Sequence, residues 1–344
     1  MSKKINVLDL FCGCGGLSLG FEDAGFNVAF GIDSWSDALK TFAFNHKNAK
    51  AIQKDLGLIK ISDIKDEGIA NIDVIIGGPP CQGFSIAGKR LISDERNLLY
   101  KSFVSFVEEL QPKLFLMENV PNIMAMGKGI VRDSILKDFE AIGYKTTFKV
   151  LLASDYGVPQ NRRRAFFIGV KDAPLFEFPL SDLDVKINTK DAISDLPDRD
   201  IDDGSKYSIK PRSEYQKRMR ANSKLLYNQQ LTNHKPKTVE IISLVPDGGN
   251  YKDLPSDLQG TRKVNIAWTR LNSQKPSFTI DTGHRHHFHY KFNRVPTVRE
   301  SARIQSFPDD FIFLGSKTSQ YKQVGNAVPP LLSKVLAEAI KNHL

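Results

Sequence analysis

Cysteine is scarce in this chain of 344 residues, which contains only Cys12, Cys14 and Cys81. Three cysteines cannot form the framework of a disulfide-stabilised secreted domain, so a reducing cytoplasm is the simplest setting. Cys12 and Cys14 are also too few and too close together for a structural zinc site. Long apolar runs are absent as well: no segment approaches the roughly 20 residues of a membrane span. The first residues lead directly into a strand-like run, so we expect no signal peptide and no membrane association.

Acidic residues are rare in one basic segment, residues 205–237, although the whole chain carries a formal net charge of only +9. This segment contains nine Lys and Arg residues against one acid, Glu214, and nine minus one gives +8, nearly the whole excess. Such a patch suits a polyanion such as nucleic acid, and it is equally compatible with an ordinary solvated surface.

Strand-like and helix-like runs alternate through the first 170 residues, which predicts an α/β fold with a mostly parallel sheet covered on both faces. Ligands of such sheets bind at the carboxyl ends of the strands. The strand-like runs are 5–11, 27–33, 73–77, 113–118, 146–152 and 165–170, and the helix-like runs are 17–23, 35–45, 97–110 and 129–142.

The alternation ends near residue 172. The next 120 residues or so are irregular, with Asp- and Pro-rich, basic and aromatic stretches. Clear signals return near the end: a helix is predicted over 297–305, with Thr297 as its cap and Glu300 three residues later, and an amphipathic helix over 329–340. We therefore predict a discontinuous domain, 1–171 and 293–344, with a smaller domain inserted at 172–292.

A possible nucleophile follows the apolar run 73–76. Residues 77–85 read Gly-Gly-Pro-Pro-Cys-Gln-Gly-Phe-Ser, so a strand leads into a turn that presents the thiol of Cys81. The prolines fix φ before the thiol, and the glycines allow a ligand to approach the backbone. In Pro80-Cys81-Gln82 this loop resembles the nucleophile loop of the DNA (cytosine-5) methyltransferases.

Further motifs of that family follow in the family's order, over about 1–171 and 293–344. A single buried cysteine or a run of arginines would by itself usually be structural, but the ordered set identifies the chain as resembling this family. The matching segments are the glycine loop Asp9–Leu17, Glu-Asn-Val at 118–120, Gln160–Arg164, Arg299–Pro308, Gln323–Pro329 and, more loosely, Arg96–Leu99.

The resemblance implies a Rossmann-like domain that binds S-adenosylmethionine and releases S-adenosylhomocysteine. The glycine loop alone would equally fit a dinucleotide site, and Asp33 could bind ribose in either case. Family members often have an aromatic residue directly after this acid, whereas here Ser34 intervenes before Trp35, so whether Trp35 stacks on adenine stays open. The cofactor-binding residues implied are Phe11, Gly13, Gly16, Asp33, Asp55, Leu56, Gly78, Pro79, Leu99, Asn326 and Val328.

The implied reaction begins when the Cys81 thiolate adds to carbon 6 of cytosine, which activates carbon 5 toward the methyl group. Glu118 would protonate or hydrogen-bond ring nitrogen 3. Arg164 would contact the cytosine carbonyl oxygen, and Arg162 would bind phosphate or pair with Glu118. The catalytic residues implied are Cys81, Glu118, Arg162 and Arg164.

Carbon 6 is hidden within duplex DNA, so the target nucleotide must be flipped out of the stack. In the family the inserted segment is the target-recognition domain, whose cations bind phosphates. Candidates for base reading are Arg270, Asn272, Gln274 and the histidine-rich stretch 283–289, for which metal binding is a less favoured alternative, and no metal is expected. The substrate-binding residues implied are Gln82, Ser85, Asn119, Gln160, Lys217, Arg218, Arg220 and Arg270.

The compact length favours a bacterial enzyme of a restriction–modification system, with a cognate endonuclease as a possible partner. Because base flipping needs one copy, we expect a monomer in the cytoplasm. A transfer RNA methyltransferase on the same fold and a catalytically silent nucleic-acid-binding module are the alternatives. A nicotinamide oxidoreductase would explain the glycine loop but not Cys81, Glu118 and the arginines together.

Overall fold

The computed structural model describes residues 4–80, 98–181, 185–261, 268–281 and 287–344. Cys81, Gln82 and Ser85, together with most of the histidine-rich stretch, lie outside the described residues. By its internal contacts the chain forms two compact units. The first unit comprises Met1–Leu152, Arg163–Ser181 and Leu332–Leu344, and the second comprises Ala153–Arg162 and Asp182–Leu331.

This grouping by contacts places residues 293–331 in the second unit, together with the inserted segment. The sequence instead assigns 293–344 to the catalytic part, on the basis of its motifs. The functional division at residues 172 and 293 stays a prediction, because contacts within the chain do not test where cofactor and DNA bind.

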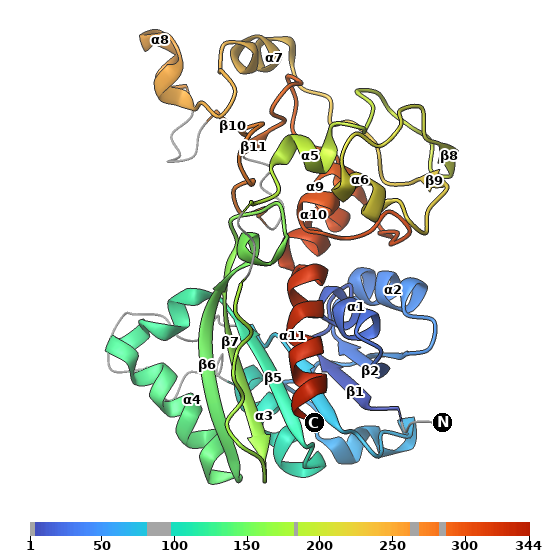
Figure 1. The fold of residues 1–344 in the computed structure, drawn as a ribbon, viewed down its shortest axis with the longest axis vertical. Helices are drawn as coiled ribbons and strands as arrows, with labels where there is room; N and C mark the ends of the chain where they lie inside the picture. The colour runs from blue at the N-terminus through green and yellow to red at the C-terminus, as the bar shows by residue number, and fades with distance from the viewer. Residues whose placement is uncertain (1–3, 81–97, 182–184, 262–267, 282–286) are drawn as a thin grey trace. The chain divides into compact units, whose positions relative to one another are not determined.

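The first unit contains a seven-stranded sheet in the order β3-β2-β1-β4-β5-β7-β6 (Figure 1). The first five strands in this order pair in parallel, whereas β7 is antiparallel to both β5 and β6. The prediction of a mostly parallel α/β sheet is therefore confirmed. The strands are β1 (Asn6–Leu10), β2 (Asn27–Asp33), β3 (Lys50–Gln53), β4 (Val74–Gly77), β5 (Leu114–Asn119), β6 (Tyr144–Leu152) and β7 (Arg163–Lys171).

Helices cover both faces of this sheet. On one face α3 and α4 bury Phe103 and Phe139 against Phe115 of β5, and the Phe115 and Phe139 rings stack with centroids 3.9 Å apart. On α11 the Ser333 hydroxyl donates to the Leu17 carbonyl of α1 at 2.6 Å. The helices are α1 (Gly16–Asp23), α2 (Ser36–Asn45), α3 (Leu98–Leu110), α4 (Ile130–Ala141) and α11 (Pro330–His343), with 3-10 turns at Ile61–Glu67, Pro121–Met124 and Met126–Gly129.

The second unit consists of short helices and strands that are connected by loops. The predicted capped helix is confirmed as α9, because the Thr297 hydroxyl accepts from the Glu300 amide while the Glu300 carboxylate accepts from the Thr297 amide. The elements are α5 (Thr189–Ile193), β8 (Ser205–Lys206), α6 (Glu214–Met219), β9 (Leu225–Leu226), α7 (Pro236–Ser243), α8 (Ser256–Gln259), β10 (Thr269–Arg270), β11 (His287–Phe288), α9 (Val298–Ile304) and α10 (Lys317–Asn326), with 3-10 turns at Ala153–Tyr156 and Tyr251–Asp253.

Buried ion pairs organise this unit around α9. The Arg303 guanidinium donates to both carboxylate oxygens of Asp309, at 2.8 and 2.7 Å, and to Asp195 at 2.5 Å. Burial alone would raise the pKa of Asp309, but the adjacent Arg303 lowers it below its ordinary value. In the same helix the carboxylate of Glu300 pairs with Arg294 at 2.8 Å, and this cation outweighs the effect of burial and lowers the pKa of Glu300 to about 2.

None of the helices in the described part of the chain is long and apolar enough to cross a membrane.

The Arg303 network gives a stability prediction. Substitution Arg303→Met should lower the free energy of unfolding by about 3–5 kcal/mol, because it removes the cation that two buried carboxylates, Asp195 and Asp309, share. Urea denaturation followed by circular dichroism measures the change. The control Lys217→Met removes an exposed partner of Glu214 and should change stability little. Equal stability of the two variants would contradict the assigned role of Arg303.

Candidate active site

The glycine loop between β1 and α1 is shaped by left-handed backbone at several positions. Phe11, Gly13 and Gly15 have φ values of 59°, 54° and 93°. A side chain at Gly15 would collide with the buried ring of His46, since an ideal Cβ there lies 2.0 Å from its Nε2 atom. At Gly13 an ideal Cβ meets nothing within 4 Å. The loop is therefore packed tightly against the protein at Gly15 and open at Gly13, as a cradle for a ligand requires.

Asp33, at the end of β2, holds this loop in place. One of its carboxylate oxygens accepts a hydrogen bond from the Gly13 amide at 2.8 Å, and the other accepts from the Trp35 amide at 2.7 Å. Burial raises the pKa of Asp33 despite these amide donors. Each carboxylate oxygen can accept a further bond, so these contacts are compatible with the predicted ribose binding.

Asp9 is a residue of this loop to which the sequence analysis assigned no role. Burial raises the pKa of its carboxyl group to about 8, and the Ser18 hydroxyl of α1 donates to it at 2.6 Å. The group therefore links the end of β1 to the first helix. Its position at the end of an apolar strand was the signal that could have identified it.

Two segments that carry predicted cofactor-binding residues, the turn after β3 and the start of α3, lie close together. An ideal Cβ at Gly57 would be 3.0 Å from Leu99, so α3 approaches the turn that follows β3. In this turn Leu56 is buried, and Asp55 is exposed with its carboxylate accepting from the Gly57 amide at 2.9 Å. Asn326 and Val328 belong to the other unit, at the end of α10.

Glu118 and Arg164 form an ion pair at the end of the sheet, with Arg164 Nε 2.8 Å from Glu118 Oε1. Both side chains are largely buried. Because β7 runs antiparallel to β5, the beginning of β7 lies beside the end of β5, which brings the two residues together. The sequence analysis allowed Arg162 to be the partner of Glu118, and the structure gives this position to Arg164.

The backbone that leads to Cys81 contacts the same strand end. An ideal Cβ at Gly78 would lie 3.0 Å from Glu118 Oε2, so only glycine fits there without displacing the carboxylate. The Asn119 amide donates to the Pro79 carbonyl at 3.1 Å. Glu118 and Asn119 thus contact the two residues before Pro80.

Gln160 and Arg162 are buried scaffolding residues. The Arg162 guanidinium, 1% exposed, donates to the backbone carbonyls of Gly325 at 2.8 Å and Ile280 at 3.3 Å. The Gln160 amide contacts the Gln305 side chain, and its oxygen accepts from the Ile280 amide at 2.9 Å. These two side chains tie the start of the Gln-x-Arg-x-Arg motif to α9 and α10, so the structure offers no support for phosphate binding by Arg162.

The cations that were predicted to bind DNA differ in how far they are buried. Lys217 and Arg218 are exposed on α6, where Lys217 pairs with Glu214 at 2.6 Å. Arg220 instead has only 9% of its side chain exposed, pairs with Asp195 at 2.5 Å and stacks on the Tyr207 ring at 3.8 Å. It is therefore a structural residue, and its predicted contact with DNA finds no support here.

The Arg270 side chain is likewise buried, contrary to its predicted role in reading DNA. It is 4% exposed. All five donors of its guanidinium are used, because it donates to the carbonyls of Ile242, Val245, His289 and Phe292 and to the Asn293 side chain. His289 of the histidine-rich stretch is also buried, and burial lowers its pKa to about 4.

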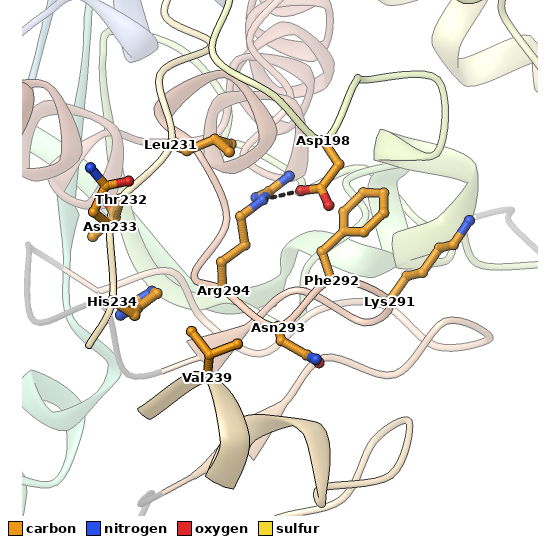
Figure 2. Close-up of a pocket in the computed structure, with 10 residues that line it drawn as sticks. All are labelled: Asp198, Leu231, Thr232, Asn233, His234, Val239, Lys291, Phe292, Asn293 and Arg294. Atoms are coloured by element: carbon orange, nitrogen blue, oxygen red, sulfur yellow. Dashed lines mark hydrogen bonds and ion pairs between the residues drawn. The ribbon is translucent and has the colours of Figure 1, made fainter. Parts of the chain in front are cut away.

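A pocket of about 560 Å³ lies beside the turn that Arg270 and His289 hold by hydrogen bonds (Figure 2). The turn that they hold forms one wall of this pocket, with Lys291, Phe292 and Asn293. The other residues that line it are Asp198, Leu231, Thr232, Asn233, His234, Val239 and Arg294. Among the described residues no group of three His, Cys, Asp or Glu side chains could hold a metal ion.

Comparisons with known proteins agree with these features. Residues 5–342 match the model of the C-5 cytosine-specific DNA methylase family. The chain is 39% identical to the type II methyltransferase M.DdeI of Desulfomicrobium norvegicum, over 98% of this chain and 88% of the relative. It is also 39% identical to the type II methyltransferase M1.HphI of Haemophilus parahaemolyticus, over 98% of this chain and 87% of that protein.

Solved structures are similar over the full length. A crystal structure described as a DNA modification methyltransferase encoded within a prophage (E. coli) has a TM-score of 0.82 and 30% identity, and covers 99% of both chains. The S. pombe Dnmt2 methyltransferase has a TM-score of 0.60 at 17% identity, over 99% of this chain and 98% of its own, which shows the fold alone. The chain thus has the Rossmann-like fold of S-adenosylmethionine-dependent methyltransferases and belongs to the C-5 cytosine-specific DNA methylase family, as a DNA (cytosine-5-)-methyltransferase of the restriction–modification type.

Proposed function

We propose that this chain transfers a methyl group to carbon 5 of a cytosine flipped out of a short, specific duplex DNA sequence, through a covalent bond between Cys81 and carbon 6. The observation that carries the proposal is the end of β5. There the Glu118 carboxylate pairs with Arg164 at 2.8 Å, and the Asn119 amide holds the Pro79 carbonyl at 3.1 Å, two residues before the thiol. An acid, a cation and the mount of a nucleophile thus converge on one strand end.

The glycine loop fits S-adenosylmethionine, because its backbone is open at Gly13 and is held by the Asp33 carboxylate. We assign the binding of this cofactor to Phe11, Gly13, Gly16, Asp33, Asp55, Leu56, Gly78, Pro79, Leu99, Asn326 and Val328. When bound, it supplies an electrophilic methyl group on a sulfonium, and S-adenosylhomocysteine is released.

The residues of the chain act on the cytosine ring. The Cys81 thiolate forms a bond to carbon 6, while a proton on Glu118 hydrogen-bonds ring nitrogen 3 and stabilises the charge that develops there. Arg164 keeps Glu118 oriented and offers its remaining donors to the carbonyl oxygen. Carbon 5 then takes the methyl group, a base removes the proton from carbon 5, and the bond to Cys81 breaks as the thiolate leaves. The ring regains its aromatic character, and the Cys81 thiolate is ready for another turnover.

We assign the DNA grip to residues 172–292 and the cofactor and catalytic residues to 1–171 and 293–344. Exposed cations of the basic segment, such as Lys217 and Arg218, would bind phosphates, while Gln82 and Ser85 of the nucleophile loop would contact the target nucleotide. Methylation of one short sequence would protect DNA from a cognate endonuclease, as expected of the type II relatives. One copy of the chain suffices for this reaction.

The direct test is bisulfite sequencing of plasmid from cells that lack cytosine methylation and express the chain. We expect protected cytosines confined to one short sequence with the wild-type chain, and none with Cys81→Ser. This variant should still retard a duplex that carries the site in an electrophoretic assay, because the substitution removes the nucleophile and leaves the cationic surface intact. Protection by Cys81→Ser would refute the covalent route, and no protection by the folded wild type would refute the proposed function.

Substitution Glu118→Gln removes the acid while it keeps the size and hydrogen-bonding capacity of the side chain. We expect methyl transfer to slow by about 10²- to 10⁴-fold, the usual contribution of a positioned acid or base. Single-turnover transfer of tritiated methyl groups to the site found by sequencing measures this rate. Glu108→Gln, an exposed position on α3, is the control and should match the wild type. A normal rate for Glu118→Gln would remove Glu118 from the chemistry.

Lys217 and Arg218 are exposed whereas Arg220 is largely buried, so substitutions at these positions should have different effects. The double substitution Lys217→Gln and Arg218→Gln should reduce the slope of log affinity against log salt by about two, since each phosphate contact contributes about 0.9. Arg220→Gln should instead lower the melting temperature, because it leaves Asp195 buried without this partner. Fluorescence anisotropy at several salt concentrations and thermal melting separate the two effects. An unchanged slope in the double variant would show that the α6 surface does not bind phosphates.

A further inference from the structure

Phe278 is an exposed aromatic residue whose ring and neighbouring backbone are held by contacts with other residues. Its side chain is 45% exposed, although it lies between Ser277 and Ile280, which are buried. One face of its ring stacks on His287 of β11, with centroids 5.1 Å apart and ring planes 16° from parallel. A single exposed apolar side chain is ordinary on a protein surface. An exposed ring that is stacked and fixed in orientation is a ready-made surface for another flat ring.

The backbone on both sides of Phe278 is fixed. Ser277 donates its amide to the Pro159 carbonyl at 2.9 Å and accepts from the Asn161 amide at 2.8 Å. The hydroxyl of Thr279 donates to the Asn161 carbonyl at 3.0 Å. With anchors immediately before and after it, the Phe278 ring is presented with little freedom to lose on binding.

These anchors belong to the segment that carries the Gln-x-Arg-x-Arg motif. Gln160 accepts a hydrogen bond from the Ile280 amide, and Arg162 donates to the Ile280 carbonyl, two residues after Phe278. The same motif continues into β7, where Arg164 pairs with Glu118. The buried Gln160 and Arg162 side chains therefore hold the segment that presents Phe278.

We propose that Phe278, stacked on His287, is a binding platform for a nucleobase of the substrate DNA that loses its stacking partner when the target cytosine is flipped out. This inference rests on the proposed function. A flipped nucleotide leaves its neighbours without a stacking partner, and apolar side chains placed against the exposed bases replace the lost contact. Aromatic rings stack on any base, so the platform lowers the cost of flipping without selecting the sequence.

The test compares two duplexes that contain the site found by sequencing. In one the target cytosine is paired with guanine, and in the other it lies opposite an abasic site, where flipping is easier. Phe278→Ala should lose roughly ten- to a hundred-fold in single-turnover methylation of the paired duplex, the usual contribution of one aromatic stack. On the abasic duplex this variant should approach the wild-type rate, because less stacking must be replaced.

Two further variants serve as controls. Phe278→Trp keeps a stacking surface and should retain the wild-type rate on both duplexes. Phe44→Ala truncates a phenylalanine that is 41% exposed on α2 and should have no effect. Thermal melting shows that each variant is folded.

If Phe278→Ala lost the same fraction of its methylation rate on the paired and abasic duplexes, or lost none on either, the proposed stacking role of Phe278 would be wrong. A wild-type chain that methylates neither duplex would overturn the proposed function itself, and with it the role assigned to Phe278. The comparison of wild type with variant on the same two duplexes therefore separates the two failures.

Discussion

The parallel pairing of the central strands is the constraint on which the candidate site depends. Register places Leu10 beside both Ile32 and Gly77, so β1, β2 and β4 end at one edge of the sheet, and β5 ends there as well. The residues that follow these strands must then be neighbours. The antiparallel β7 contributes its beginning instead, which is why Arg164 lies at the start of its strand while Glu118 lies near the end of its own.

Guanidinium groups perform two different tasks in this chain, and burial separates them. Arg162, Arg220, Arg270 and Arg303 lie in the second unit, where carboxylates and backbone carbonyls occupy their donors. A buried cation must be matched in this way, because its desolvation is otherwise too costly. Arg164 is the arginine of the motif that pairs with the proposed catalytic acid. The positive charge of the sequence therefore overstates the charge available to DNA.

Local patterns in the sequence predicted the local structure well. The strands, the glycine turn and the capped helix at Thr297 follow from apolar runs and from spacings of a few residues, and these elements are found where expected. The short strand β3 was missed, because a strand of four residues with one buried side chain, Ile52, gives little signal. The roles of Arg162 and Arg270 were missed for another reason. Their acceptors are backbone carbonyls, which have no residue-specific signature, and the Gly325 carbonyl is 163 positions from Arg162.

The sequence by itself determined the family, the order of the motifs and the parallel architecture, because these depend on residue identity and on periodicity along the chain. Only the tertiary structure decided which arginine pairs with Glu118, which cations of the basic segment are exposed and which aromatic ring is presented at the surface. These outcomes depend on burial and on partners that folding brings together from distant positions. No local pattern specifies them, because the same side chain costs free energy or contributes it according to what surrounds it.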